Sequence, residues 1–86
     1  MNIAVYDTYV TKKDGREMHF DILVPDTIKD VNVIYGYGKA YLKKKGQEGQ
    51  PLTARECQFC HVEFCRPQWK TDIDSKGYHI IEMEGC

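Results

Sequence analysis

The sequence lacks an excess of charge of either sign, because 12 lysine and arginine residues stand against 13 acidic residues and leave a formal net charge of -1. Non-specific binding to nucleic acid rests on a broad positive field, so we expect no nucleic-acid partner. Long apolar runs are also absent, and no stretch approaches the roughly 20 residues that a bilayer-spanning helix needs. We therefore expect no membrane partner.

Two further absences concern location and organisation. Residues 1–7 contain no basic run followed by an apolar core, which is the pattern of a secretory signal. We therefore expect a cytoplasmic protein whose thiols stay reduced. No repeat, linker or low-complexity segment interrupts the 86 residues, of which 42% are hydrophobic. This length fits one domain, residues 1–86, with a single small core.

A β-hairpin is the clearest pattern that is present. Residues 2–11 are rich in β-branched and aromatic side chains, which favour a strand. Asp14-Gly15 predicts a hairpin turn of type I′, since both residue types tolerate positive φ. A second strand follows over residues 16–24, before Pro25 removes a backbone donor. Its alternation places on opposite faces the sets Met18, Phe20, Ile22, Val24 and Glu17, His19, Asp21, Leu23.

An amphipathic helix is predicted next. Thr27 and Asp30 have the spacing of a capping box, and apolar residues recur at intervals of three and four as far as Leu42. The helix is expected to end near Lys45, with Gly46 in the left-handed conformation.

The last third of the chain predicts a strand, a helix and a strand. Residues 57–64 alternate as a strand, and Thr53 to Glu56 repeats the capping-box spacing just before it. Pro67 suits the first turn of a helix that runs to about Ser75, and residues 78–83 have the composition of a final strand. The predicted fold is α+β, in the order ββαβαβ, with a four-stranded sheet and two helices packed on one face.

The only dense cluster of reactive side chains comprises Cys57, Cys60, His61 and Cys65. Cys57 to His61 matches the C-x-x-C-H pattern of c-type haem attachment. That attachment requires export and a mainly helical wrapper, so we do not expect haem here. A zinc centre would use Cys57, Cys60 and His61, completed by His19 from the hairpin. In a regular strand Cys57 and His61 share a face and Cys60 points away, so joint ligation requires a bend.

Two other interpretations of the same cysteines remain open. Cys57 and Cys60 can form a reversible disulfide, although in thioredoxin-like proteins the C-x-x-C pair follows a strand and opens a long helix. Alternatively, both thiols are small buried hydrophobic groups, with His61 hydrogen-bonded in place. Which way these side chains face distinguishes the interpretations.

Several short segments make the chain resemble a family of small bacterial proteins, domain-of-unknown-function family 2024. The segments are Val5–Val10, Asp14-Gly15, Met18–Asp21, Leu23–Pro25, Tyr41-Leu42, Gly46, Leu52-Thr53, Glu56-Cys57, Phe59–His61, Glu63, Gly77-Tyr78 and Glu84–Cys86. The resemblance implies an α+β fold and a free-standing domain, and it brings no activity, substrate or cofactor. The residues that match the family's motifs and form our shortlist for a site are His19, Asp21, Cys57, Cys60, His61 and Glu63. Cys65 departs from the family pattern.

The sequence contains no nucleophile elbow, phosphate loop or paired-carboxylate signature. We therefore predict a bacterial domain that acts through binding or assembly, with exposed sheet edges that support a homodimer. The alternatives are a zinc-binding domain that uses Cys57, Cys60, His61 and His19, and a thiol redox protein that uses Cys57 and Cys60. No small-molecule ligand is indicated.

Overall fold

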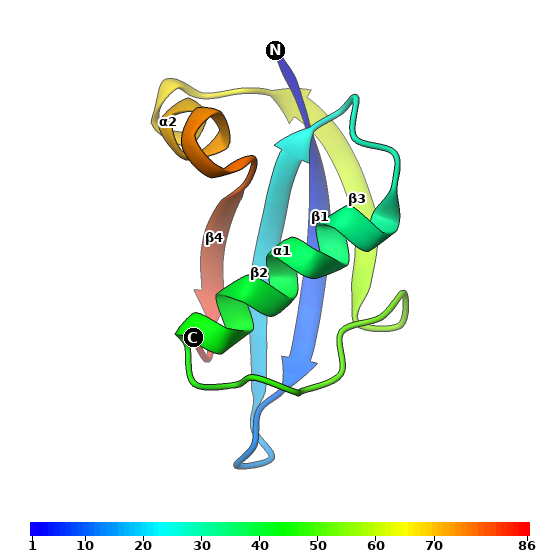
Figure 1. Ribbon diagram of the computed structural model, residues 1–86, viewed down its shortest axis with the longest axis vertical. Coiled ribbons are helices and arrows are strands. Elements are labelled where there is room, and N and C mark those ends of the chain that lie inside the picture. Colours follow the sequence, from blue (N-terminus) through cyan, green and yellow to red (C-terminus); the bar gives the residue numbers. More distant parts are fainter.

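The computed structural model covers residues 1–86 and has the element order ββαβαβ that the sequence predicts. Four antiparallel strands form one sheet in the order β3-β1-β2-β4. The strands and helices are β1 (Asn2–Thr11), β2 (Glu17–Pro25), α1 (Val31–Lys44), β3 (Cys57–Phe64), α2 (Pro67–Lys76) and β4 (His79–Glu84). Figure 1 shows the hairpin of β1 and β2 in the centre of the sheet, with β3 and β4 at its two edges. The α+β class and the four-stranded sheet are confirmed.

The hairpin turn differs from the predicted type I′ turn. The backbone N–H of Lys12 donates to Arg16 at 2.7 Å, so the loop has three residues, Lys13–Gly15. Gly15 has φ of +88°, and no residue other than glycine has positive φ. A two-residue turn would pair Val10 with His19, whereas the observed register pairs Val10 with Met18. The apolar side chains that share a face therefore set the register, and the loop adapts to it.

The main core lies between the sheet and α1. Even-numbered side chains of the central hairpin, among them Phe20 and Ile22, pack against Ile34 and Leu42 of the helix. The helix begins three residues later than a Thr27 cap predicts, because Asp30 is the N-cap and its carboxylate accepts a hydrogen bond from the N–H of Asn32. Its end agrees with the prediction, since Gly46 takes φ of +75°.

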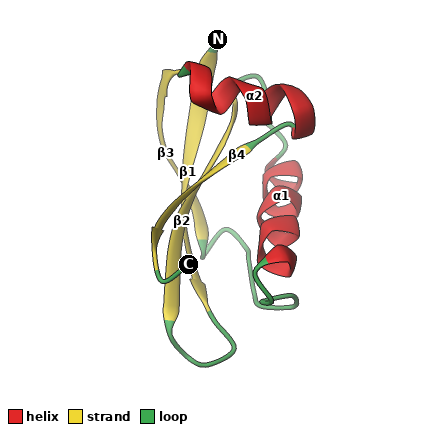
Figure 2. Ribbon diagram, turned by 90° about the vertical axis from the view of Figure 1, so that its left-hand side faces the viewer, coloured by secondary structure: helices red, strands yellow, loops and turns green.

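The second helix does not pack on the same face as the first, and this part of the prediction is wrong. The buried side chains of α2, Trp69 and Ile73, form a separate cluster with the odd-numbered Ile3, Val5 and Leu23, which point away from α1. Figure 2 shows α1 along one side of the sheet and α2 across its end. α1 already occupies the even-numbered face, and the apolar residues of the other face need their own cover. Neither helix has the length and apolar composition needed to cross a membrane.

Candidate functional site

Polar side chains occupy the part of the odd-numbered face that neither helix covers. Asp7 of β1 and Asp21 of β2 are direct cross-strand partners, and His19 is the partner of Tyr9 one step along. Side chains two residues apart on a strand share a face, so the carboxylates and the imidazole gather there. We call this region, defined by Asp7, Tyr9, His19 and Asp21, the open face.

The imidazole of His19 holds the cluster together. Its Nε2 atom lies 2.5 Å from Oδ1 of Asp7 and 3.8 Å from Oδ1 of Asp21. One donor atom from each of the three side chains lies within 4.8 Å of the others. The ring of Tyr9 stacks on the imidazole, with centroids 4.0 Å apart and an interplanar angle of 14°. Stacking and hydrogen bonding together fix the ring orientation.

Two carboxylates close together on a half-buried surface are electrostatically unfavourable. Burial, a hydrogen bond with Asp7 and the charge of Asp7 together raise the pKa of Asp21 to about 6, although the nearby His19 and His61 act in the opposite direction. The open face therefore carries negative charge that a bound cation would stabilise.

Strand β3 brings a second histidine-carboxylate pair to the same side of the sheet. His61 is the partner of Val5, and Glu63 is the partner of Ile3, so both side chains face the odd-numbered side. Nε2 of His61 lies 2.5 Å from Oε2 of Glu63, and its Nδ1 lies 3.2 Å from Sγ of Cys60. The pair lies on the strand next to β1, beside the open face.

A β-bulge at Cys60 decides how the cysteines face. Val5 pairs with His61 but Tyr6 pairs with Phe59, so Cys60 is the additional residue on β3. Cys57 is the partner of Thr8 and points into the α1 core, where only 3% of it is exposed and burial raises the pKa of its thiol. The expectation from a regular strand, with Cys57 and His61 on one face, is wrong because the bulge reverses the alternation.

The four residues predicted as zinc ligands are therefore only partly brought together. His19 and His61 reach the same side of the sheet, Cys57 lies in the opposite core, and Cys60 is exposed at the bulge. The one converging group of three or more potential ligands is Asp7, His19 and Asp21. A zinc centre on the cysteines, like a disulfide between Cys57 and Cys60, remains a prediction.

Asp7 was absent from the sequence shortlist. Its signal was the hairpin itself, because the register that pairs Val10 with Met18 also places Asp7 opposite Asp21. The apolar alternation of the two strands predicts that register. The two-residue turn assumed from Asp14-Gly15 predicts a different one.

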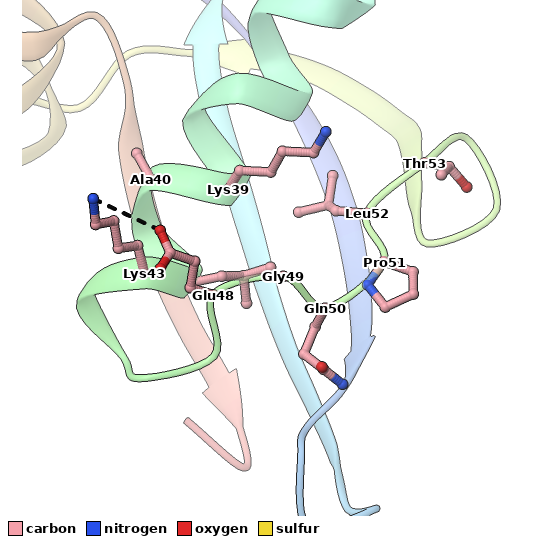
Figure 3. A pocket seen from close by; sticks show the side chains of 10 residues that line it. Lys39, Ala40, Lys43, Glu48, Gly49, Gln50, Pro51, Leu52 and Thr53 are labelled. Carbon is pink, nitrogen blue, oxygen red and sulfur yellow. Dashed lines mark ion pairs between the residues drawn. The ribbon is translucent and has the colours of Figure 1, made fainter.

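The two pockets of the domain lie elsewhere. The larger, of about 530 Å³, lies between α1 and the loop that follows it (Figure 3), and it contains neither an imidazole nor a thiol. Its charged groups include Lys43 and Glu48, which pair with each other at 3.7 Å. The second pocket lies between the end of α1, α2 and β4. The open face therefore remains the better candidate for a metal site, since it holds the one group of three converging potential ligands.

The fold and the open face define a small α+β domain with one packed and one partly uncovered sheet face. The chain belongs to the family described as "Domain of unknown function (DUF2024)", whose model matches residues 1–83. It is similar to protein NE1680 from Nitrosomonas europaea, whose NMR structure gives a TM-score of 0.84 at 44% sequence identity over 100% of this chain and 99% of that one. None of the curated proteins matches this chain.

The burial of the thiols predicts their order of reaction. We expect Cys60 and Cys86, which are exposed, to react quickly with a disulfide reagent such as Ellman's reagent, and the buried Cys57 and Cys65 to react slowly. Burial limits access to both thiols and raises the pKa of the Cys57 thiol, so the rate at Cys57 should be lower by on the order of tenfold or more. Cys60→Ser should remove one fast equivalent, and Cys57→Ser one slow equivalent. A fast Cys57 would contradict this placement.

Proposed function

We propose that this domain is a binding module that holds one divalent metal ion, preferentially zinc, on its open face through Asp7, His19 and Asp21. The observation that supports this most directly is the convergence of one nitrogen and two carboxylate oxygens within 4.8 Å of one another. The proposal retains His19 from the zinc site predicted from sequence. In place of Cys57, Cys60 and His61 it uses the carboxylates of Asp7 and Asp21.

The distances suit a small cation after a modest adjustment. A tetrahedral zinc ion with bonds of about 2.0 to 2.1 Å separates its ligand atoms by about 3.3 Å. The 3.8 Å between Nε2 of His19 and Oδ1 of Asp21 is close to that value. The 2.5 Å between His19 and Asp7 is a hydrogen bond, and an ion replaces its proton. Asp7 has room to rotate outward, because 38% of its side chain is exposed.

The donor set favours zinc over magnesium and calcium. Hard cations prefer all-oxygen sites, whereas an imidazole nitrogen suits zinc and other late first-row metals. Three protein ligands leave a fourth position of a tetrahedral ion for water or for a donor from another molecule. Both pockets of the domain lie along α1, and neither includes the open face. A molecule bound at the fourth position would therefore stay in contact with solvent. These features support binding rather than an enclosed reaction.

Metal titration by calorimetry tests the proposal on protein purified without a histidine tag and stripped with EDTA. We expect zinc to bind near one equivalent per chain, and magnesium to give no measurable heat. Loss of an outer-shell partner already weakens metal sites 10- to 100-fold, so His19→Ala should weaken zinc binding by about 100-fold or more. Asp21→Asn should weaken it by about tenfold or more.

His79 offers a matched control, because its imidazole also pairs with a carboxylate, that of Asp72 at 2.7 Å, but no third ligand converges there. His79→Ala should bind zinc like the unmodified protein, and so should Cys57→Ser and Cys60→Ser. Binding that survives His19→Ala and Asp21→Asn would exclude the site on the open face. Loss of zinc in Cys60→Ser, with Asp21→Asn unaffected, would instead support the cysteine site.

A further inference from the structure

Strand β3 is an edge strand with an unusually apolar exposed side. The exposed fractions of the residues Phe59, Val62 and Phe64 are 55%, 48% and 74%. Natural edge strands are commonly protected by lysine, by proline or by bulges. β3 contains neither lysine nor proline, and its bulge at Cys60 leaves the segment from His61 to Phe64 in regular register with β1. This segment therefore presents a flat, apolar edge.

The direction of the backbone groups on this segment follows from one hydrogen bond. The N–H of Cys65 donates to the carbonyl of Met1 at 2.9 Å, so the backbone of Cys65 faces β1. In an antiparallel ladder the residues that hydrogen-bond to a given neighbour alternate. Glu63 and His61 consequently face β1 as well, and Val62 and Phe64 direct their N–H and C=O groups outward. The free edge can accept one further strand at these two residues.

We propose that this strand is β3 of a second copy of the chain, paired antiparallel about a two-fold axis at Val62, so that the two sheets join into one. A two-fold axis makes the contact self-complementary, and the outward-facing Val62 groups then bond to each other reciprocally. The same register places His61 of one copy opposite Glu63 of the other, twice, on the odd-numbered side.

Neighbouring registers are less favourable because they place side chains of the same kind opposite each other. Moving the axis to Glu63 sets Glu63 opposite Glu63, and moving it to His61 sets two imidazoles opposite each other. A pairing that matches outward-facing with inward-facing residues forms no ladder. Only the register centred on Val62 combines outward hydrogen bonds with opposite charges.

The pairing also covers the apolar side chains. Val62 meets its symmetry mate and Phe64 lies opposite the bulge at Cys60, so two exposed hydrophobic residues lose part of their contact with water. An interface built on one strand is small, so the dimer is expected to form in a concentration-dependent manner. This inference is independent of the metal site, because it uses the edge of β3 and none of Asp7, His19 or Asp21.

Sedimentation velocity over a wide range of concentrations, with EDTA present to exclude metal bridges, tests the dimer. The unmodified chain should shift from monomer to dimer as concentration rises. Val62→Pro should remain monomeric at every concentration, because proline removes the outward N–H while the pairing with β1 uses neighbouring residues. Val62→Lys provides a second disruption that keeps the N–H. Circular dichroism on both variants establishes that they are folded.

Substitutions elsewhere separate this register from other modes of association. Met83→Lys changes an exposed residue of the opposite edge strand, β4, and should dimerise normally. His61→Glu should weaken the dimer by setting Glu63 against a second glutamate, and the double exchange His61→Glu with Glu63→His should restore it. A chain that is monomeric at all concentrations, which is the outcome if the edge serves a different protein, would overturn the proposal. Dimerisation of Val62→Pro or monomeric Met83→Lys would overturn it equally.

Discussion

Asp21→Asn is expected to raise the free energy of unfolding at neutral pH by about 2 to 3 kcal/mol, although it removes a charged group. The pKa of Asp21 is raised from an ordinary 3.8 to about 6, chiefly by burial and then by Asp7. The unfolded chain therefore gives up this proton more readily than the folded domain. The stability associated with the protonated group is fully present below the ordinary value and is lost as pH rises through about 6. Asparagine mimics the protonated form.

Urea denaturation at a series of pH values, in EDTA, measures this effect. The advantage of Asp21→Asn over the unmodified protein should be small near pH 4, grow between about pH 4 and 6, and level off above that. Asp74→Asn is the control, since Asp74 lies on the surface of α2, where it pairs with Lys70 at 2.7 Å. Its effect should be slight, as is usual for exposed ion pairs. A difference for Asp21→Asn that does not vary with pH would rule out carboxylate repulsion as its cause.

Excess zinc should make the unmodified protein more stable than Asp21→Asn, which reverses the order expected in EDTA. A ligand that binds only the folded state stabilises it in proportion to the logarithm of its concentration over its dissociation constant. Excess zinc therefore stabilises the unmodified protein strongly and Asp21→Asn weakly. A sheet that keeps two carboxylates together at a cost in stability is consistent with a cation site, because strained electrostatics concentrate at functional positions.

The fold was largely predictable because local signals agreed with one another. Apolar alternation in the hairpin, Gly46 at a helix end and Pro67 at a helix start all describe short-range geometry. The helix start was misplaced because both Thr27 and Asp30 are good caps. The backbone N–H of Ile28 bonds to the carbonyl of Pro25, and this turn keeps Thr27 outside the helix. The face of the sheet that α2 covers depends on packing between residues far apart in the sequence. Local sequence patterns do not predict that face.

The candidate site was predictable only in part. His19 and Asp21 were found from their family motif, and the hairpin alternation placed them on one face, as observed. The faces on which Cys57 and His61 lie were predicted wrongly, because one additional residue, Cys60, shifts the register of β3 against β1. A bulge is a property of two paired strands, and the sequence of one strand carries little sign of it. Asp7 was missed because its role depends on the cross-strand pairing with Asp21, which the segment that contains Asp7 does not reveal by itself.

Trp69→Ala is expected to lower the free energy of unfolding by about 3 to 5 kcal/mol, the usual cost of truncating a buried tryptophan. Trp69 is 7% exposed and joins α2 to the apolar end of the face opposite α1. Its ring is further held by the guanidinium of Arg66, 5.2 Å from the ring centroid. For a domain of this size such a loss is a large fraction of the total, so a sizeable unfolded population is expected at 37 °C.

Two features of the chain shape this experiment and its interpretation. Trp69 is the only tryptophan, so unfolding of the variants is followed by far-ultraviolet circular dichroism rather than by tryptophan fluorescence. Trp69→Phe keeps an aromatic ring in the cluster and should cost clearly less than Trp69→Ala, on the order of 1 to 2 kcal/mol.

Gly36→Ala is the surface control. It lies on the exposed side of α1, where an added Cβ meets nothing within 4 Å, and should be neutral or stabilising by up to about 1 kcal/mol. If Trp69→Ala cost no more than a surface change, the second cluster would not be a core. The open face would then extend over the whole odd-numbered side of the sheet, because α2 would no longer divide it into a covered apolar end and an uncovered polar one.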